Sequence, residues 1–326
     1  MTLRLSPDYP LLDAFDRHHV NWISEEAAER QDFRPLYIGI LNIMPKAQEY
    51  EYNLLAPMGR SILQIVPIWI RLVTHAYKST DHAHLDRHYL PFDWAQTVAA
   101  LDGLIITGAP VENKAWDDIT YWPELSRIID VAHQNGTLLL GICWGALALA
   151  KHLGLEKTVY PRKVFGLYET HNLDVTHVHP IMSGLDDVFL CPQSRFSGIA
   201  DATLEQAARE GKVRLLAHAP EVGYVIFDTP DGQLTMHLGH QEYNSGRILA
   251  EARRDAARPD VPPPVHFNPD TPNTWRANRN VFFSGWIKHV YLTTPYQKPA
   301  GTPRAIGNEC PVPPADDLPP TGDLPS

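Results

Sequence analysis

The chain has few cysteines and no long apolar run, and both absences narrow what it can be. Its 326 residues include three cysteines, Cys143, Cys191 and Cys310, which lie far apart and form no Cys-x-x-Cys pair. An odd number of scattered thiols is typical of reduced cysteines rather than of a disulfide framework. No stretch approaches the ~20 apolar residues of a membrane-spanning helix. The N-terminus also lacks the apolar core of a signal peptide. We therefore expect a cytoplasmic protein that does not enter a membrane.

Basic residues are also fewer than acidic ones. The chain has 28 Lys and Arg against 38 Asp and Glu, a formal net charge of −10. Proteins that bind nucleic acid need clustered basic residues to neutralise phosphates, so we do not expect nucleic acid as a partner. Histidines gather at His82, His84 and His88 and at His177 and His179. No Cys or carboxylate ligand accompanies them at the spacing of a zinc site, so we predict no bound metal.

Apolar runs alternate with helical patterns in the first half of the chain. The predicted strands are 36–44, 62–72, 101–107 and 137–142, and the predicted helices are 49–58, 119–135 and 146–153. Pro67 falls inside the second strand, so we expect that residue at a sheet edge or bulge. Strands that alternate with helices imply parallel pairing through right-handed crossovers. The expected fold is an α/β three-layer sandwich with a mostly parallel sheet.

The second half is richer in short strand-like segments. They are 164–168, 173–178, 214–217, 223–228 and 234–239, and Asp231-Gly232 predicts a hairpin turn between the last two. After residue 297 proline and glycine crowd the sequence, which is typical of disorder. We therefore divide the chain into an N-terminal extension that packs on the domain (1–33), a catalytic domain (34–297) and a disordered tail (298–326).

Cys143 is the candidate nucleophile. It lies in Gly141-Ile142-Cys143-Trp144-Gly145, directly between a predicted strand and a predicted helix. This is the pattern of a nucleophile elbow with cysteine in place of serine. The flanking glycines permit a sharp turn, and the helix N-terminus favours a thiolate and offers N–H groups to an oxyanion. The alternative is a buried cysteine that only fills space at a strand end.

His240 is the candidate general base. A thiol that carries an acyl group needs a proton acceptor, usually a histidine oriented by a carboxylate. In Gly239-His240-Gln241-Glu242, an extended chain would project residues 240 and 242 to the same side, so Glu242 could hold the His240 ring. A surface loop with incidental polar residues is the alternative.

Taken together, the motifs resemble the homoserine O-acyltransferases of methionine synthesis, which include transsuccinylases and transacetylases. The resemblance spans residues 34–297. It rests on Arg34-Pro35-Leu36, Leu41-Asn42-Ile43-Met44-Pro45-Lys46, Asp102-Gly103-Leu104, Thr107-Gly108-Ala109-Pro110, Tyr121-Trp122-Pro123, Cys143-Trp144, Ser194-Arg195, Gly239-His240, Glu242-Tyr243 and Thr294-Pro295-Tyr296. It implies a class I glutamine amidotransferase-like (flavodoxin-like) fold and a homodimer.

The resemblance also implies a ping-pong reaction with acyl-CoA as cosubstrate and no permanently bound cofactor. Cys143 would attack the acyl-CoA thioester, His240 would act as general base, and Glu242 would orient it. Lys46 matches a family lysine near the active site, and we assign it to thioester or oxyanion stabilisation.

Three further residues match family positions that bind the amino-acid acceptor: Lys163, Ser194 and Arg254. An arginine can clamp an α-carboxylate with two hydrogen bonds, and a serine can hydrogen-bond polar substrate atoms. The expected acceptor is L-homoserine. L-Serine, one methylene shorter, is the alternative, because one methylene is worth only ~1 to 3 kcal/mol of discrimination. The sequence departs from the family pattern near the expected pocket at Leu147, Gln193 and Gln241.

Glu112 falls where the resemblance places the selector of the acyl donor. Family members with glycine there resemble succinyl users, and members with glutamate resemble acetyl users. A distal succinyl carboxylate ~4 Å from Glu112 would cost on the order of 4 kcal/mol at an effective dielectric constant of ~20. We therefore predict acetyl-CoA as the donor, with succinyl-CoA as the alternative.

Two other functions share parts of this pattern. A glutamine amidotransferase has the same cysteine elbow and His-x-Glu arrangement but needs a synthetase partner or domain to receive ammonia. A non-catalytic relative would only bind a metabolite. The intact set of Cys143, His240 and Glu242 favours an enzyme.

Overall fold

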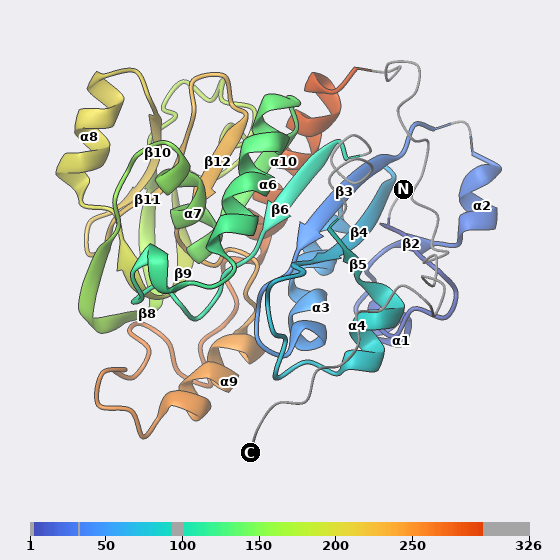
Figure 1. Ribbon diagram of the computed structural model, residues 1–326, viewed down its shortest axis with the longest axis horizontal. Helices are drawn as coiled ribbons and strands as arrows, with labels where there is room; N and C mark the ends of the chain where they lie inside the picture. Colours follow the sequence, from blue (N-terminus) through green and yellow to red (C-terminus); the bar gives the residue numbers. More distant parts are fainter. Residues whose placement is uncertain (1–2, 32, 93–100, 296–326) are drawn as a thin grey trace.

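Strands and helices largely alternate in the first half of the chain, and the described strands of both halves join in one sheet (Figure 1). This computed structural model describes residues 3–31, 33–92 and 101–295. The strands are β1 (Leu3–Arg4), β2 (Trp22–Ile23), β3 (Leu36–Leu41), β4 (Ile65–Arg71), β5 (Leu90–Pro91), β6 (Gly103–Ile106), β7 (Leu138–Ile142), β8 (Thr158–Asn172), β9 (Val188–Gly198), β10 (Arg214–Ala219), β11 (Gly223–Asp228) and β12 (Leu234–His237). The helices are α1 (Leu12–Arg17), α2 (Glu25–Glu29), α3 (Ala47–Met58), α4 (His82–His88), the 3-10 helix η1 (Trp116–Asp118), α6 (Trp122–Gln134), α7 (Trp144–His152), α8 (Asp201–Arg209), α9 (Ser245–Asp255) and α10 (Arg276–Thr293).

The sheet has a parallel and an antiparallel half. Its strand order is β2-β1-β4-β3-β6-β7-β12-β11-β10-β8-β9, and β5 pairs with β4 beside this path. The pairings from β2 through β12 are parallel. Those from β12 to β9 are antiparallel. The predicted α/β architecture with a mostly parallel sheet is confirmed.

Each face of the sheet is covered by its own apolar cluster. Helices α6, α7 and α8 contribute to one cluster, and α3 and α10 contribute to the other. Figure 1 shows α6 and α7 in front of the strands and α10 behind them. The amphipathic pattern of α6 explains its position, because Leu125, Ile128, Ile129 and Ala132 are buried along one side. The protein therefore has the three expected layers.

Two local predictions about the strands are confirmed. Pro67 lies in β4 opposite Ile38 of β3. On the other side of β4, β1 meets Ile65 and β5 meets Ile70 and Arg71, so Pro67 falls between these pairings. At that place its missing N–H costs no ladder hydrogen bond. The Asp231-Gly232 turn joins β11 to β12 as an antiparallel hairpin.

The strand predicted over 173–178 is wrong. These residues form a turn, in which Val175 and Val178 are largely exposed. The Asp174 carboxylate accepts a hydrogen bond from the His179 backbone N–H at 2.7 Å, and His177 has a φ of 51°. Local side-chain hydrogen bonds of this kind compete with strand pairing.

Several elements have no counterpart in the prediction. Within residues 34–297 they are α4, β5, η1, β9, α8, α9 and α10. The predicted strand 164–168 is only the middle of the long strand β8. Residues 1–33, predicted as an N-terminal extension, supply β1 and β2 beside β4. Cys310 and the tail predicted to be disordered, 298–326, lie outside the described residues.

Candidate active site

Cys143 lies in a sharp turn at the carboxyl end of β7 and directly precedes α7. Its backbone has φ 53° and ψ −112°, a conformation that costs a non-glycine residue about 1 to 3 kcal/mol. Gly141 and Gly145 must both be glycine, because other backbone atoms lie too close to leave room for a Cβ. A Cβ on Gly141 would lie 2.5 Å from the Gly145 carbonyl oxygen, and one on Gly145 would lie 2.1 Å from the Ile106 carbonyl oxygen. The strained turn directs the side chain of residue 143 out of the sheet at the helix N-terminus, as in a nucleophile elbow.

His240 follows the neighbouring strand β12 and faces the same end of the sheet. Its Nδ1 lies 2.6 Å from Glu242 Oε1, and its ring stacks on the Tyr243 ring at 4.1 Å between centroids. Burial alone would lower the pKa of His240. The charges of Cys143 and Glu242 and hydrogen bonds to both side chains outweigh this effect and raise the pKa well above its ordinary value. The ring is thus arranged to hold a proton beside the sulfur.

The contact between His240 and Glu242 was predicted from an extended chain, and that reason is wrong. Residues 240–243 form a turn, closed by a hydrogen bond of 3.0 Å from the Tyr243 N–H to the His240 carbonyl oxygen. Glu242 is buried and also accepts a hydrogen bond from the hydroxyl of Tyr50, on α3. The carboxylate therefore joins the histidine to α3, whose buried side chains belong to the same apolar cluster as Cys143 and Tyr243.

One cavity of about 200 Å³ brings most of the predicted site residues together. Its lining includes Cys143, His240, Lys163, Ser194, Arg254 and Glu112. Lys46 is different: its Nζ pairs with Glu49 at 3.0 Å and its side chain is 62% exposed. Its chain neighbours Met44 and Pro45 line the cavity, so Lys46 lies beside the site with its side chain turned outward.

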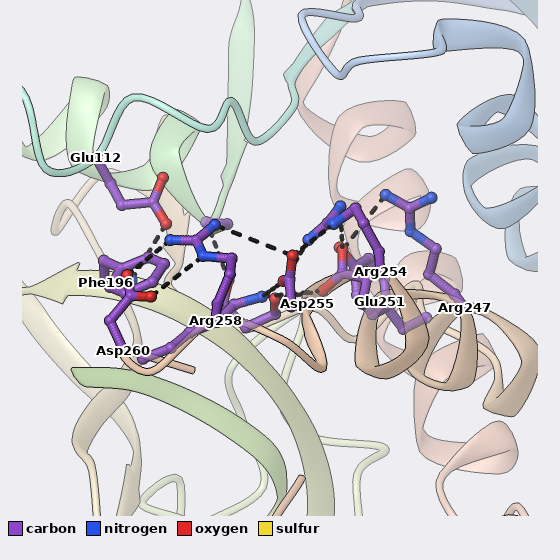
Figure 2. Close-up of polar contacts among 12 residues, drawn as sticks. Glu112, Phe196, Arg247, Glu251, Arg254, Asp255, Arg258 and Asp260 are labelled. Carbon is purple, nitrogen blue, oxygen red and sulfur yellow. Dashed lines mark hydrogen bonds and ion pairs between the residues drawn. The ribbon is translucent and has the colours of Figure 1, made fainter. Parts of the chain in front are cut away.

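Helix α9 supplies one wall of this cavity, which we call the acceptor wall (Figure 2). Its centre is the buried Glu251, whose carboxylate accepts hydrogen bonds from Ser194 Oγ at 2.5 Å and Tyr243 OH at 2.8 Å. Lys163 Nζ lies 3.5 Å from Glu251 and 3.1 Å from Asp255. Burial would raise the pKa of Glu251, but the charges of Lys163, Arg247 and His240 lower it to about 2. The wall is a network of buried opposite charges.

Two arginines lie where the acceptor wall meets solvent. The Arg254 guanidinium donates through Nε and Nη2 to Asp255, at 2.8 and 2.7 Å, and its side chain is 55% exposed. Arg258 makes the same kind of pair with Asp260 and lies 5.2 Å above the Phe196 ring (Figure 2). The predicted carboxylate clamp, Arg254, is therefore at the cavity but bound to a neighbouring carboxylate.

Glu112 is fixed at the opposite side of the cavity (Figure 2). Its Oε1 accepts a hydrogen bond from the Phe196 backbone N–H at 3.1 Å, and its carbonyl oxygen accepts one from Ser197 Oγ at 2.7 Å. The side chain is buried. These contacts hold a carboxylate at a defined place in the same cavity as Cys143.

Neither a metal cluster nor a membrane helix is found in residues 3–31, 33–92 and 101–295. No group of three or more His, Cys, Asp or Glu side chains there is arranged to hold a metal ion. No helix of this part is long and apolar enough to cross a membrane.

Sequence reasoning missed four residues of the site: Tyr50, Tyr243, Glu251 and Asp255. Tyr243 was noted only as part of a motif. The other three belong to α3 and α9, and each has a partner in the site that is more than 50 residues away along the chain. The one local signal was the charge pattern of α9, where Arg247, Glu251 and Arg254 follow at helical spacing.

Comparison with known proteins identifies the family of the chain. A family profile described as homoserine O-succinyltransferase matches residues 2–296. A homoserine O-acetyltransferase of Geobacillus sp. (strain WCH70) is 36% identical over 306 residues, which cover 91% of this chain and 99% of that protein. A homoserine O-acetyltransferase of Shouchella clausii is 35% identical over 305 residues, covering 91% and 97%.

Among solved structures, a glutamine amidotransferase from Thermotoga maritima has a TM-score of 0.52 at 12% identity. The match covers 80% of this chain and 99% of that chain, and it confirms the predicted class I glutamine amidotransferase-like fold. At this identity the likeness concerns the fold alone. Function follows instead from the sequence matches, which span nearly the whole chain: the protein belongs to the homoserine O-succinyltransferase family of acyltransferases.

Proposed function

We propose that this acyltransferase moves an acetyl group from acetyl-CoA to the hydroxyl of L-homoserine through a thioester on Cys143, a step of methionine synthesis. The observation that carries the proposal is a single cavity. It places a cysteine at a helix N-terminus and a histidine paired with a buried carboxylate opposite a wall of mixed charge.

In the first half-reaction, His240 takes the Cys143 proton and the thiolate attacks the thioester carbonyl of acetyl-CoA. The negative charge that develops on the carbonyl oxygen is stabilised by N–H groups of the first turn of α7. The C–S bond to coenzyme A then breaks, and the leaving thiolate takes the proton from His240. The acetyl group remains on Cys143.

In the second half-reaction, the acceptor hydroxyl gives its proton to His240 and attacks the acetyl carbonyl. The Cys143 thiolate leaves and regains the proton. Glu242 holds Nδ1 during both steps, so the other ring nitrogen exchanges protons with the reacting groups.

The acceptor wall suits a zwitterion, because it offers both signs of charge next to the nucleophile. Glu251 and Asp255 are negative, and Lys163 and Arg254 are positive. Arg254 can leave Asp255 to bind an α-carboxylate in the same forked geometry. These contacts serve L-serine as well as L-homoserine, so serine is the alternative acceptor.

Glu112 favours acetyl over succinyl as the donor group. Because the Phe196 N–H fixes one carboxylate oxygen, Glu112 cannot easily turn away from a succinyl carboxylate. The repulsion of on the order of 4 kcal/mol corresponds to roughly a thousandfold slower reaction. Succinyl-CoA is the alternative donor.

Intact-protein mass spectrometry tests the thioester. The protein is mixed with acetyl-CoA in the absence of acceptor, and we expect a gain of one acetyl group that Cys143→Ala abolishes. Adding L-homoserine should then remove the acetyl group from the wild type faster than L-serine does. Retention of the mass gain in Cys143→Ala would refute the mechanism.

The donor assignment has its own test. We expect the wild type to use acetyl-CoA far better than succinyl-CoA, and Glu112→Gly to raise kcat/KM for succinyl-CoA by at least tenfold. Asp117→Gly, at a nearby exposed carboxylate on η1 that does not line the cavity, is the control. Equal gains in both variants would exclude Glu112 as the selector.

A further inference from the structure

Tyr50 contacts the pair of Glu242 and His240 from helix α3. It lies on α3, and its hydroxyl donates a hydrogen bond to Oε1 of Glu242. The same oxygen lies 2.6 Å from Nδ1 of His240. Oε1 therefore receives two donors, whereas Oε2 is buried without a hydrogen-bond partner among the described residues. The charge of this buried carboxylate is compensated at one oxygen only.

A buried carboxylate with so few partners depends strongly on each of them. Both Tyr50 and Glu242 are almost completely buried. Burial, and next the charge of Glu242, raise the pKa of Tyr50 well above its ordinary value, so its hydroxyl stays protonated. The Tyr50 ring is held in place by Tyr243, at 6.3 Å between centroids, and by the Arg247 guanidinium, at 5.8 Å. The Tyr50 hydroxyl therefore remains protonated and is held in one position as a hydrogen-bond donor.

We propose that Tyr50 is a positioning residue that holds Oε1 of Glu242 against Nδ1 of His240 and so confines proton exchange to the His240 nitrogen facing Cys143. By donating to Oε1, Tyr50 fixes the orientation of the carboxylate with a hydrogen bond to a charged oxygen. The Nδ1 proton of His240 then stays on the ring when the ring becomes positively charged. This inference rests on the proposed function and extends it by one residue.

The other charged and titratable groups around Tyr50, Glu242 and His240 come from several elements. They are Cys143 before α7, His237 of β12, His240 and Tyr243 of the following turn, Cys191 of β9, Arg247 and Glu251 of α9, and Arg279 of α10. Of these, His240 is the one that shares the carboxylate oxygen with Tyr50. Removal of the Tyr50 hydroxyl should therefore act mainly on the hydrogen bond between Glu242 and His240.

The test is Tyr50→Phe, which removes the hydroxyl and keeps the ring. Without this donor the Glu242 carboxylate keeps only one of its two hydrogen bonds, so the acidic limb of the pH profile of kcat/KM should move upward by about one pH unit. On the acidic side this lowers kcat/KM about tenfold, and activity should approach that of the wild type at higher pH. A purely structural defect would instead lower activity equally at every pH.

Tyr9→Phe is the matched control. Tyr9 is also buried, and its hydroxyl donates to a buried carboxylate, Glu51, at 2.7 Å. Glu51 is the neighbour of Tyr50 on α3 but does not contact Glu242 or His240 in any hydrogen bond of the described residues. We expect a similar loss of thermal stability and an unchanged pH profile.

A double-mutant cycle keeps the inference testable if the single variant is unstable. In a Glu242→Gln background there is no charge for Tyr50 to stabilise, so adding Tyr50→Phe should change the rate of Cys143 acetylation less than twofold. An equal loss in both backgrounds, or a pH profile of Tyr50→Phe that superimposes on the wild type, overturns the inference. Failure of the wild type itself to become acetylated would refute the proposed function instead.

Discussion

The cavity has two walls that are held together in different ways. On the nucleophile side, Cys143 is placed by backbone geometry: a strand, a strained turn and two glycines without room for a side chain. On the acceptor side, Lys163 is placed by buried ion pairs with Glu251 and Asp255. The side fixed by backbone geometry should not tolerate added side-chain atoms. The side fixed by ion pairs should instead be sensitive to removal of a charge and to pH.

Gly145→Ala should have the largest effect, because it tests the backbone-built wall directly. The new Cβ would lie 2.1 Å from the Ile106 carbonyl oxygen, which belongs to the central strand β6 and cannot move aside. We expect a loss of about 4 to 5 kcal/mol in the free energy of unfolding, measured by urea denaturation. Gly154→Ala, where a Cβ meets no atom within 4 Å, is the control and should cost about 1 kcal/mol for its positive φ. Similar losses in the two variants would contradict the comparison.

Lys163→Met tests the charge-built wall. It removes the buried cation that pairs with two buried carboxylates, Glu251 and Asp255, and we expect a loss of about 3 kcal/mol in the free energy of unfolding at neutral pH. Acid should weaken the wild type in a defined window. The folded pKa of Glu251, about 2, is below its ordinary value of 4.5, so its contribution is present above pH ~4.5 and is lost as the pH falls towards 2. Denaturation curves from pH 5 to pH 2 should fall less steeply for Lys163→Met, and equal slopes would show that the wall does not depend on this pair.

Arg254→Gln should have a smaller and more selective effect. If Arg254 clamps the acceptor carboxylate, KM for the amino acid should rise about tenfold, while KM for acetyl-CoA changes less than twofold. Arg253→Gln removes the same charge from an adjacent exposed position on α9 that does not line the cavity. Steady-state kinetics with both substrates would distinguish the two variants, and a rise confined to KM for acetyl-CoA would exclude the clamp.

The smallest expected effect concerns stored strain at residue 143. With φ 53° and ψ −112°, this position favours a residue without Cβ. Cys143→Gly should therefore be more stable than Cys143→Ala by about 1 kcal/mol, the reverse of the usual order of these residues. Thermal unfolding of the two inactive variants measures this difference. An alanine variant that is the more stable one would mean that the turn carries no strain.

The same contrast explains which parts could be predicted from the sequence. The central parallel strands and the elbow at Cys143 have local signals, namely apolar runs and glycines at fixed spacing. The acceptor wall joins β8 to α9 across about 90 residues, and no local pattern marks such a pairing. Lys163, Ser194 and Arg254 came from the family resemblance rather than from their surroundings.

Where local signals were used without knowledge of tertiary contacts, two interpretations failed. The apolar residues in 173–178 suggested a strand, but the Asp174 carboxylate accepts a hydrogen bond from the His179 N–H that holds a turn, and Val175 is exposed. Glu242 reaches His240 because the chain turns at residues 240–243, not because it is extended. In both places a few local hydrogen bonds outweigh the periodic pattern.

The shared cavity has a kinetic consequence under the proposed function. Cys143, the acceptor wall and Glu112 all border the same space of about 200 Å³. Coenzyme A must therefore depart before the amino acid can occupy its place, and each molecule obstructs the other. Free coenzyme A would compete with the amino acid for the protein that is acetylated on Cys143. As coenzyme A accumulates, it should therefore slow the transfer of the acetyl group to the amino acid.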